Sequence, residues 1–520
     1  MNKKSLAPVV PLRREFLRGV GYTAAALAVS SRLRADDVPQ PAYRASTDAS
    51  DDPLFMSATK LAGLIRSRQI SAAEAVKLHI AQIEAWHPKI NAVVATCFER
   101  ALYEAETADG ALARGDKLGA LHGVPMTIKD SFDTEGVVST AGTLGRKDFV
   151  PGYDATVVAR ARAAGAIMLG KTNTPEFTLG GGGRGTFNLV YGMTNNPYDI
   201  RYQPGASSGG SGANVASGGA SFDIGSDIAG SVRYPAHING VVGLKPTFGR
   251  TSRFGHIVGY GGAYDSFQET GPLARRVEDL ALLMPIISGP DNRDCALAPV
   301  PFGDPWAVNV RKLRVAFFAT NGENHPTQEI QAMVKRCAQY FAAAGCRVTE
   351  DMPPMMGELG YARGVVSSAS DGYLTKTLLA RAGTKQAGPG LMYPGDPKPA
   401  GEFTRAYELL DAARSAQLAW FENYDVIVCP VSTRAGNPHG YESPPSPPSK
   451  PGRANPYYMA GFNTNGWPAG VVRAGTSKED PGLPLGVQVV GQPWRDDVVI
   501  AALAHIEKHS GGFVPPKLPA

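Results

Sequence analysis

Cysteine is scarce in this sequence, with five residues in 520. The five form no C-x-x-C pair and no zinc-ligand spacing: Cys97, Cys295, Cys337, Cys346 and Cys429. An odd number of irregularly spaced cysteines does not make a disulfide framework. The sequence therefore argues against a small disulfide-stapled protein and contains no cysteine zinc site.

Positive charge is missing from most of the chain. The formal net charge is +5, but residues 1–35 hold seven Lys and Arg against a single Glu, which leaves about −1 for the remainder. Nothing basic remains there to hold a phosphate backbone. The sequence therefore argues against a nucleic-acid partner.

Long apolar runs are absent as well. The mildly apolar stretch Gly19–Ser31 is shorter than the ~20 residues that a membrane-spanning helix needs, so we expect no stable membrane span. The stretch follows Arg13-Arg14-Glu-Phe-Leu and leads to a small residue, Ala35, as in a cleavable signal peptide. The paired arginines resemble a twin-arginine export signal, although Leu12 stands where Ser or Thr is commoner.

We therefore expect an exported protein, periplasmic or secreted, with three parts. Residues 1–35 are predicted to form the signal, residues 36–53 a polar linker, and residues 54–515 the functional domain. A hydrophobic fraction of 43% is enough for that domain to bury a sizeable core.

Helical and strand patterns alternate along the domain, which favours an α/β sandwich. Ser71 and Glu74 make a capping box at the start of one helix. Helices are predicted at 57–66, 71–86, 155–164, 277–287 and 496–509, and strands at 120–128, 166–169, 313–318, 425–429 and 486–490. Irregular loops are expected over 387–401 and 436–456, where Gly and Pro are frequent.

The residues that could do chemistry lie in and after a Gly/Ser-rich tract. Gly205-Ala-Ser-Ser-Gly-Gly-Ser-Gly212 has the composition of a linker, but buried-type hydrophobic residues with one Ser and one Arg follow it over 222–235. Small residues at such a place let several backbone N–H groups point at one spot. This is what a preorganised anion-binding loop requires.

These segments resemble the amidase signature family. The tract and Asp227-Ile-Ala-Gly-Ser-Val-Arg-Tyr-Pro235 fit its long signature, and Leu121–Gly136 is similar to its lysine segment. Further matches are Gly170–Phe177, Gly192–Pro197, Gly243–Thr247, Thr270–Arg275 and Leu483–Gly491. The resemblance thins over about 294–420, which we interpret as a variable substrate-specificity region. It implies one α/β/α sandwich with a large mixed, mostly parallel sheet.

Carried over by position, the resemblance implies three catalytic residues: Lys129, Ser207 and Ser231. Neutral Lys129 would draw a proton through Ser207 from Ser231, whose oxygen attacks an amide carbonyl and forms an acyl-enzyme. Burial favours a neutral lysine, and a hydroxyl can relay a proton because it both donates and accepts. The oxyanion would be held by the backbone N–H groups of Ile228, Ala229, Gly230 and Ser231.

Other signature residues are assigned supporting roles. Asp227 and Arg233 are expected to hold the loop rather than to touch substrate. Ala229 stands where many members of the family have Gly, and we interpret its methyl group as trimming the pocket. The segments Leu359–Pro399 and Tyr457–Phe462 are expected to line the acyl pocket.

The implied function is hydrolysis of a carboxylic amide to an acid and ammonia or an amine. No metal and no cofactor are expected to take part. The expected partner is a small-molecule amide substrate. Dimers are common in the family, so a homodimer is one expected state.

Alternative functions stay open. Gly205-Ala-Ser207-Ser-Gly209 also fits the G-x-S-x-G elbow of α/β-hydrolases, with Ser207 as nucleophile, although no strand pattern leads into it. The histidines that could then serve as its base are His237, His256, His325 and His439. An esterase could use the same triad as an amidase. A glutaminase subunit of a tRNA-dependent amidotransferase is disfavoured by the export signal, and a non-catalytic binding protein by the intact triad.

Overall fold

The computed structural model describes residues 38–41, 44–180, 184–259, 262–263, 265–369, 371–392, 397–441, 450–452, 458–480 and 482–518. The predicted signal over 1–35 lies outside these residues. The described part of the predicted linker forms no helix or strand, but it is attached to the domain. Within it, the Thr47 N–H donates to Glu278 at 3.0 Å, and Asp48 pairs with Arg276 at 3.0 Å.

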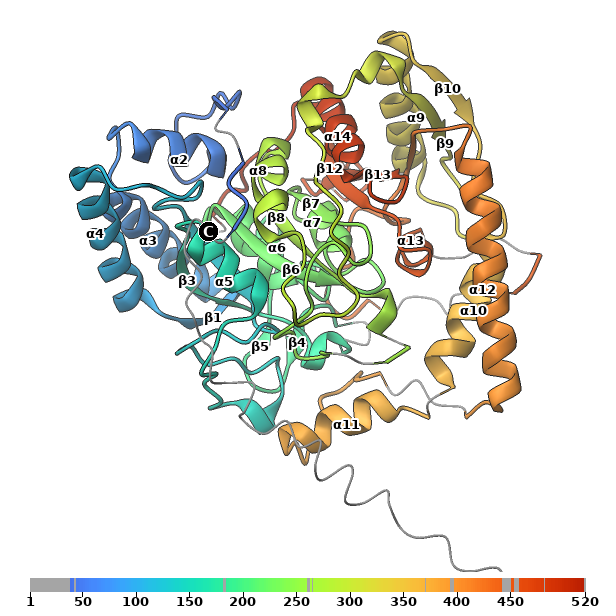
Figure 1. The fold of residues 1–520 in the computed structure, drawn as a ribbon, viewed down its shortest axis with the longest axis horizontal. Helices are drawn as coiled ribbons and strands as arrows, with labels where there is room; N and C mark the ends of the chain where they lie inside the picture. Colours follow the sequence, from blue (N-terminus) through green and yellow to red (C-terminus); the bar gives the residue numbers. More distant parts are fainter. Residues whose placement is uncertain are drawn as a thin grey trace, which may run out of the picture. The chain divides into compact units, whose positions relative to one another are not determined.

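An eleven-stranded sheet forms the centre of the described chain (Figure 1). Its order is β1-β3-β2-β6-β8-β7-β12-β13-β11-β9-β10. The strands are β1 (Val93–Thr96), β2 (Pro125–Lys129), β3 (Ile167–Thr172), β6 (Phe222–Asp227), β7 (Val242–Lys245), β8 (Glu269–Ala274), β9 (Arg314–Phe317), β10 (Arg347–Glu350), β11 (Val426–Pro430), β12 (Ala469–Thr476) and β13 (Pro484–Gly491). A separate two-stranded sheet pairs β4 (Phe187–Asn188) with β5 (Gly192–Met193).

Helices surround the sheet and confirm the predicted α/β/α class (Figure 1). They are α2 (Ala58–Arg66), α3 (Ala72–Ile90), α4 (Phe98–Arg114), α5 (Thr156–Ala163), α6 (Gly209–Ala216), α7 (Arg233–Ile238), α8 (Val277–Ile287), α9 (Gln328–Ala343), α10 (Met356–Ser368), α11 (Tyr373–Ala382), α12 (Ala400–Phe421), α13 (Ala460–Thr464) and α14 (Asp496–Ser510). None of these helices is both long and apolar enough to cross a bilayer.

The large mixed sheet is as predicted, but its parallel pairs form two blocks rather than the majority. Within the described residues, β3-β2-β6 and β11-β9-β10 pair in parallel, and the other six neighbouring pairs are antiparallel. The two blocks consist of strands whose connections contain helices, as parallel neighbours require. The central strands lie antiparallel and include β12 and β13, which adjoin in sequence.

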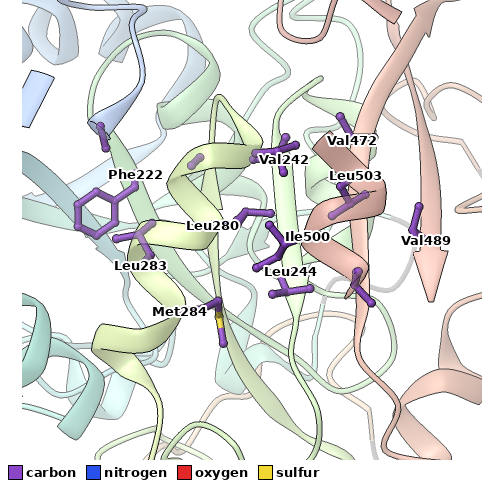
Figure 2. Close-up of a cluster of buried hydrophobic side chains, with 14 of the residues drawn as sticks. Phe222, Val242, Leu244, Leu280, Leu283, Met284, Val472, Val489, Ile500 and Leu503 are labelled. Atoms are coloured by element: carbon purple, nitrogen blue, oxygen red, sulfur yellow. The ribbon is translucent and has the colours of Figure 1, made fainter. Parts of the chain in front are cut away.

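The core covers both faces of the sheet because successive side chains on a strand point to opposite sides. Val472 of β12 packs in one cluster with Leu280 of α8 and Leu503 of α14, as Figure 2 shows. Its neighbour Val471 packs in another cluster with Val215 and Ala216 of α6 and with residues of α7. Each face is therefore sealed by its own layer of helices.

Local signals predict the helix starts well. Ser57 and Ser71 accept hydrogen bonds from the N–H groups of Lys60 and Glu74, so both cap a helix as expected. The strand predicted over 120–128 is shorter, because residues before Pro125 turn and Gly123 adopts a φ of +76°. The sequence pattern indicates no particular helix over 294–420, where the structure has α9, α10, α11 and most of α12.

The Gly/Ser-rich tract forms a helix instead of a linker. From Gly209 onward it is α6, and all eight residues of this helix are buried. A Cβ on Gly210 would lie 2.4 Å from the backbone nitrogen of Asn173, and one on Gly209 would lie 2.2 Å from Thr186 Oγ1. The glycines of this helix therefore permit close packing of backbones rather than flexibility.

Candidate active site

Lys129 lies at the carboxyl end of β2, and the parallel pairing of β2 with β6 brings it to the end of β6. Its side chain has no solvent exposure. The side-chain nitrogen, Nζ, lies 2.6 Å from the Ser207 hydroxyl, 3.0 Å from the Ser226 hydroxyl and 3.4 Å from the Ser226 carbonyl oxygen. The structure thus brings together two of the three residues that the sequence singles out.

Ser207 lies in the turn that leads into α6, and only 3% of its surface is exposed. The Ala206–Ser207 peptide bond is cis. The next residue joins this turn to the third predicted catalytic residue, because the Ser208 N–H donates to the Ser231 carbonyl oxygen at 3.1 Å. The loops that carry the two serines are therefore directly hydrogen-bonded.

Ser231 lies between β6 and α7 and is half-buried. Among the described residues, no hydrogen bond involves its hydroxyl group. Of the three predicted catalytic side chains it is the most accessible, whereas Lys129 and Ser207 are enclosed. Of the three side chains, Ser231 is therefore the one most open to a substrate.

Asp227, the last residue of β6, organises the loop that follows. Its carboxylate accepts hydrogen bonds from the backbone N–H groups of Gly230 at 2.7 Å, Val232 at 3.1 Å and Arg233 at 3.3 Å. The Asn463 side-chain amide also donates to it, at 2.9 Å. These contacts hold the loop, which is the role expected for Asp227.

The same contacts correct one part of the predicted oxyanion site. The Gly230 N–H donates to Asp227, so it is not available to a developing oxyanion. Within the described residues, the N–H groups of Ile228, Ala229 and Ser231 have no acceptor. Gly230 instead supplies a turn with a φ of +119°, against which the Met459 side chain packs.

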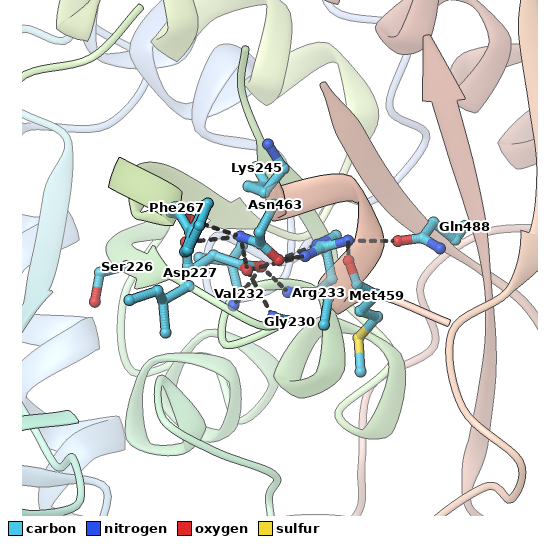
Figure 3. Close-up of polar contacts among 12 residues, drawn as sticks. Ser226, Asp227, Gly230, Val232, Arg233, Lys245, Phe267, Met459, Asn463 and Gln488 are labelled. Carbon is cyan, nitrogen blue, oxygen red and sulfur yellow. Dashed lines mark hydrogen bonds and ion pairs between the residues drawn. The ribbon is translucent and has the colours of Figure 1, made fainter. Parts of the chain in front are cut away.

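Arg233 neutralises the buried Asp227 and links the loop to other segments (Figure 3). Both side chains are fully buried, and they lie 3.0 Å apart. Arg233 also donates to the Met459 carbonyl at 3.0 Å, to Gln488 at 2.8 Å and to Asn463 at 2.5 Å. The ion pair and these hydrogen bonds restrain the backbone of the loop, so the loop has one preferred conformation.

A family model described as Amidase matches residues 74–500. The chain belongs to the amidase family. It is 32% identical over 492 residues to a glutamyl-tRNA(Gln) amidotransferase subunit of Heliobacterium modesticaldum, with 88% of this chain and 97% of that one covered. It is 33% identical over 487 residues to an indoleacetamide hydrolase of Bradyrhizobium diazoefficiens, with 88% and 86% covered.

Solved structures agree with this membership. The chain resembles 6-aminohexanoate cyclic dimer hydrolase complexed with substrate, with a TM-score of 0.77, 29% identity, and 89% of this chain and 99% of that one covered. The similarity extends over the whole domain rather than over one motif. The amidase described here is accordingly an enzyme that hydrolyses amide C–N bonds.

The electrostatics of the amidase site favour a neutral lysine. Burial lowers the pKa of Lys129 to about 7, and the nearby Asp227 and Asp223 carboxylates oppose that shift. Asp223 accepts hydrogen bonds from Thr127 at 2.7 Å and Thr172 at 3.0 Å, and burial raises its pKa to about 6. Near neutral pH, a large fraction of Lys129 is therefore an amine that can accept a proton.

His256 is placed differently from the expectation for an α/β-hydrolase. Its Nε2 atom lies 3.0 Å from the Ser226 hydroxyl, and the Val258 N–H donates to its Nδ1 atom at 3.3 Å. Because Nδ1 accepts, the proton of the neutral ring is on Nε2 and is donated to Ser226. Burial and the charge of Lys129 lower the pKa of His256, which keeps the ring neutral.

None of the other candidate histidines is hydrogen-bonded to Ser207 in the described residues, and neither ring nitrogen of His439 has a hydrogen-bond partner there. His237 accepts a hydrogen bond at Nδ1 from the Gly486 N–H group at 2.8 Å, and its Nε2 atom lies 3.1 Å from the Arg434 carbonyl oxygen. His325 contacts Thr320. The Ser207 hydroxyl is paired with Lys129 instead. The geometry of the described residues therefore contains no serine–histidine pair at the G-x-S-x-G stretch.

Sequence reasoning missed Ser226 and Asn463 as members of the site. Ser226 adjoins Asp227 in the signature, and a buried strand end beside a predicted lysine could have indicated it. Asn463 comes from α13, more than 230 residues further along the chain, and no sequence pattern connects it to Asp227. Only the fold reveals that contact.

Proposed function

We propose that this amidase hydrolyses a small-molecule carboxylic amide through an acyl-enzyme on Ser231. The Ser231 proton passes through the Ser207 hydroxyl to neutral Lys129 while the Ser231 oxygen attacks the carbonyl carbon. As the C–N bond breaks, the proton returns along the same relay to the leaving nitrogen. Water then attacks the ester and releases the acid, with Ser231 regenerated.

One observation carries this proposal. The Lys129 Nζ atom and the Ser207 Oγ atom lie 2.6 Å apart in a fully buried environment that lowers the pKa of the lysine. A general base must lie within hydrogen-bonding reach of the proton that it takes, and its pKa should be near the working pH. Both conditions are met at Lys129.

The loop after Asp227 supplies the complementary function. The unengaged N–H groups of Ile228, Ala229 and Ser231 are the donors that we assign to the oxyanion of the tetrahedral intermediate. Removing one donor from such a site in other enzymes costs about 10²–10³ in rate. The tightly held Asp227 carboxylate favours donors that are already in place before substrate binds.

The relatives define the amides to test first. They suggest indoleacetamide, 6-aminohexanoate cyclic dimer and L-glutamine, to which the panel adds p-nitroacetanilide as an aryl amide, each with a matched ester where one exists. Turnover of glutamine alone would favour the role of an amidotransferase subunit. Turnover of esters alone would identify an esterase, and binding without turnover by the wild type would favour a binding protein.

Variants of the three residues test the mechanism on the same panel. Ser231→Ala is expected to abolish turnover, and Ser207→Ala and Lys129→Ala to reduce kcat by several powers of ten. Ser208→Ala is the matched control: it removes a buried neighbouring hydroxyl that contacts the Ser226 carbonyl, and it should retain most activity. Turnover that survives Ser231→Ala but not Ser207→Ala would make Ser207 the nucleophile.

We also propose that the enzyme works outside the cytoplasm. The support is Arg13-Arg14 ahead of an apolar stretch in residues 1–35. Fusing this segment to a reporter in a host with a twin-arginine translocase should deliver the reporter to the periplasm. Replacing both arginines by lysine should retain it inside the cell; equal export by both fusions would contradict the proposal.

A further inference from the structure

The α10 helix contacts the oxyanion loop in two ways: its apolar side chains pack in one cluster with Ile228, and one of its arginines donates hydrogen bonds to the loop. Arg363 of α10 donates from its guanidinium to the Ile228 carbonyl oxygen at 2.6 Å. The same group donates to the Thr464 hydroxyl at 3.2 Å and to the Ala460 carbonyl at 3.4 Å, both in α13. It also lies over the Phe267 ring, 4.9 Å from the centroid.

The contact with Ile228 has a geometric consequence for the next N–H group. A trans peptide unit is planar, so its C=O and N–H bonds point in opposite directions. When Arg363 holds the Ile228 carbonyl on one side of the loop, the Ala229 N–H must point to the other side. Ala229 is exposed and its N–H has no acceptor among the described residues.

The loop is therefore held from two directions. Asp227 fixes the N–H groups of Gly230 and Val232, while Arg363 fixes the carbonyl that precedes Ala229. The two clamps also meet at α13, because Asn463 of that helix donates to Asp227. A charged donor to a carbonyl is a stronger constraint than a neutral one.

We propose that Arg363 is a positioning residue that orients the Ile228–Ala229 peptide so that the Ala229 N–H faces the oxyanion. This inference rests on the proposed Ser231 mechanism. It gives the variable α10 helix a part in the chemical step. Arg363 acts through the backbone of the loop. It therefore changes how strongly the loop stabilises the transition state, and it does not contact the substrate itself.

The test compares two arginines of the same helical layer. Arg363→Met removes the donors, and Arg363→Lys keeps a charged donor that can still reach a carbonyl. The matched control is Arg414→Met, because Arg414 of α12 also donates to a backbone carbonyl, that of Thr464, at 2.7 Å. Arg414 has no contact with the Ile228 carbonyl in the described structure.

We expect Arg363→Met to lower kcat about 10–100-fold with KM within about threefold, since one oxyanion donor is misdirected rather than removed. Arg363→Lys should restore part of the rate, and Arg414→Met should keep it. Affinity for the boronic acid that carries the acyl group of the fastest amide should fall by the same factor in Arg363→Met. Affinity for the carboxylic acid product should not change.

Crystal structures of wild type and Arg363→Met give a readout that needs no substrate. Wild type should show one orientation of the Ile228–Ala229 peptide, and Arg363→Met a flipped or mixed one. An unchanged peptide, an unchanged kcat, or equal losses in Arg363→Met and Arg414→Met would each overturn the inference. Absence of turnover by wild type on every amide would count against the proposed function, and the crystal structures would still decide the role of Arg363.

Discussion

The ends of β2 and β6, which carry the proposed catalytic residues and are called the catalytic end below, and the layer of α10 and α12 are built by different interactions. At the strand ends, Lys129, Asp227 and Arg233 have no exposed surface, and each makes several hydrogen bonds. In the helical layer, Leu359 and Leu410 pack in an apolar cluster, while other side chains of these helices are exposed. Figure 1 shows the two helices side by side at the edge of the domain.

We interpret this difference as the means by which one scaffold keeps its proposed active site while the region that we predict to determine specificity changes. Hydrogen bonds and buried charges are directional, so a change at the strand ends displaces reacting groups. Apolar packing is non-directional and tolerates substitution when volume is kept. The two regions meet at Ile228, whose side chain packs in the apolar cluster of α10 and whose carbonyl oxygen accepts a hydrogen bond from Arg363.

Among the variants that compare these two regions, the largest expected effect comes from breaking the buried Asp227–Arg233 ion pair. Asp227→Asn leaves the Arg233 charge uncompensated in the interior and weakens the bonds to the loop. Breaking a buried pair costs about 3–5 kcal/mol, and the loosened oxyanion loop should reduce kcat at least about 100-fold. Urea unfolding and kcat, measured on the same preparation, give the two losses. A variant with wild-type stability and wild-type kcat would contradict the view that buried charges hold the catalytic end.

The helical layer should lose stability without losing rate. Leu410→Ala opens a cavity in the cluster of α10 and α12, which also contains Ile228, and is expected to cost about 2–5 kcal/mol in unfolding free energy. We expect kcat to stay within about twofold, because Asp227 and Arg363 still hold the backbone of the loop. Leu418→Ala on the same helix is the control, because Leu418 is 45% exposed and its truncation should cost less than about 0.5 kcal/mol. A fall in kcat for Leu410→Ala would show that the layer controls catalysis through its packing.

The pH dependence of kcat/KM tests whether Lys129 is the base at the catalytic end. Protonated Lys129 cannot accept a proton, so kcat/KM should fall about tenfold per pH unit below the lysine pKa of about 7 and level off above it. The Asp223 carboxylate stabilises the ammonium form. Asp223→Asn should therefore move the half-point to lower pH. If the half-point of kcat/KM in Asp223→Asn stays at the same pH or rises, a group other than Lys129 controls the loss of activity at low pH.

The smallest effect is expected at an ion pair far from the site. Arg314 and Asp425 connect β9 to the start of β11 at 2.8 Å, and their side chains are 38% and 29% exposed. Asp425→Asn should cost no more than about 1 kcal/mol and should leave the pH half-point unchanged. It is the control for Asp227→Asn and Asp223→Asn. If Asp425→Asn lowers the free energy of unfolding as much as Asp227→Asn, burial does not explain the difference expected between the two ion pairs.

Local sequence signals determined much of this protein. The caps at Ser57 and Ser71, the helix at 277–287 and the strand–helix alternation depend on neighbouring residues and on period, which a sequence displays directly. The signature motifs also place Lys129, Ser207 and Ser231 in one hypothesis from residue order alone. The meeting of Lys129 with Ser207 then follows from the parallel pairing of β2 with β6 and the packing of α6.

Other features were decided by the tertiary structure alone. The sequence does not show that the Gly230 N–H is taken by Asp227, that His256 donates to Ser226, or that Arg363 reaches the Ile228 carbonyl 135 residues away. A hydrogen bond depends on distances of a few tenths of an ångström and on direction. Those quantities are set only when distant segments pack, so the residues that we propose for the chemistry could be named from the sequence, and the contacts that orient them could not.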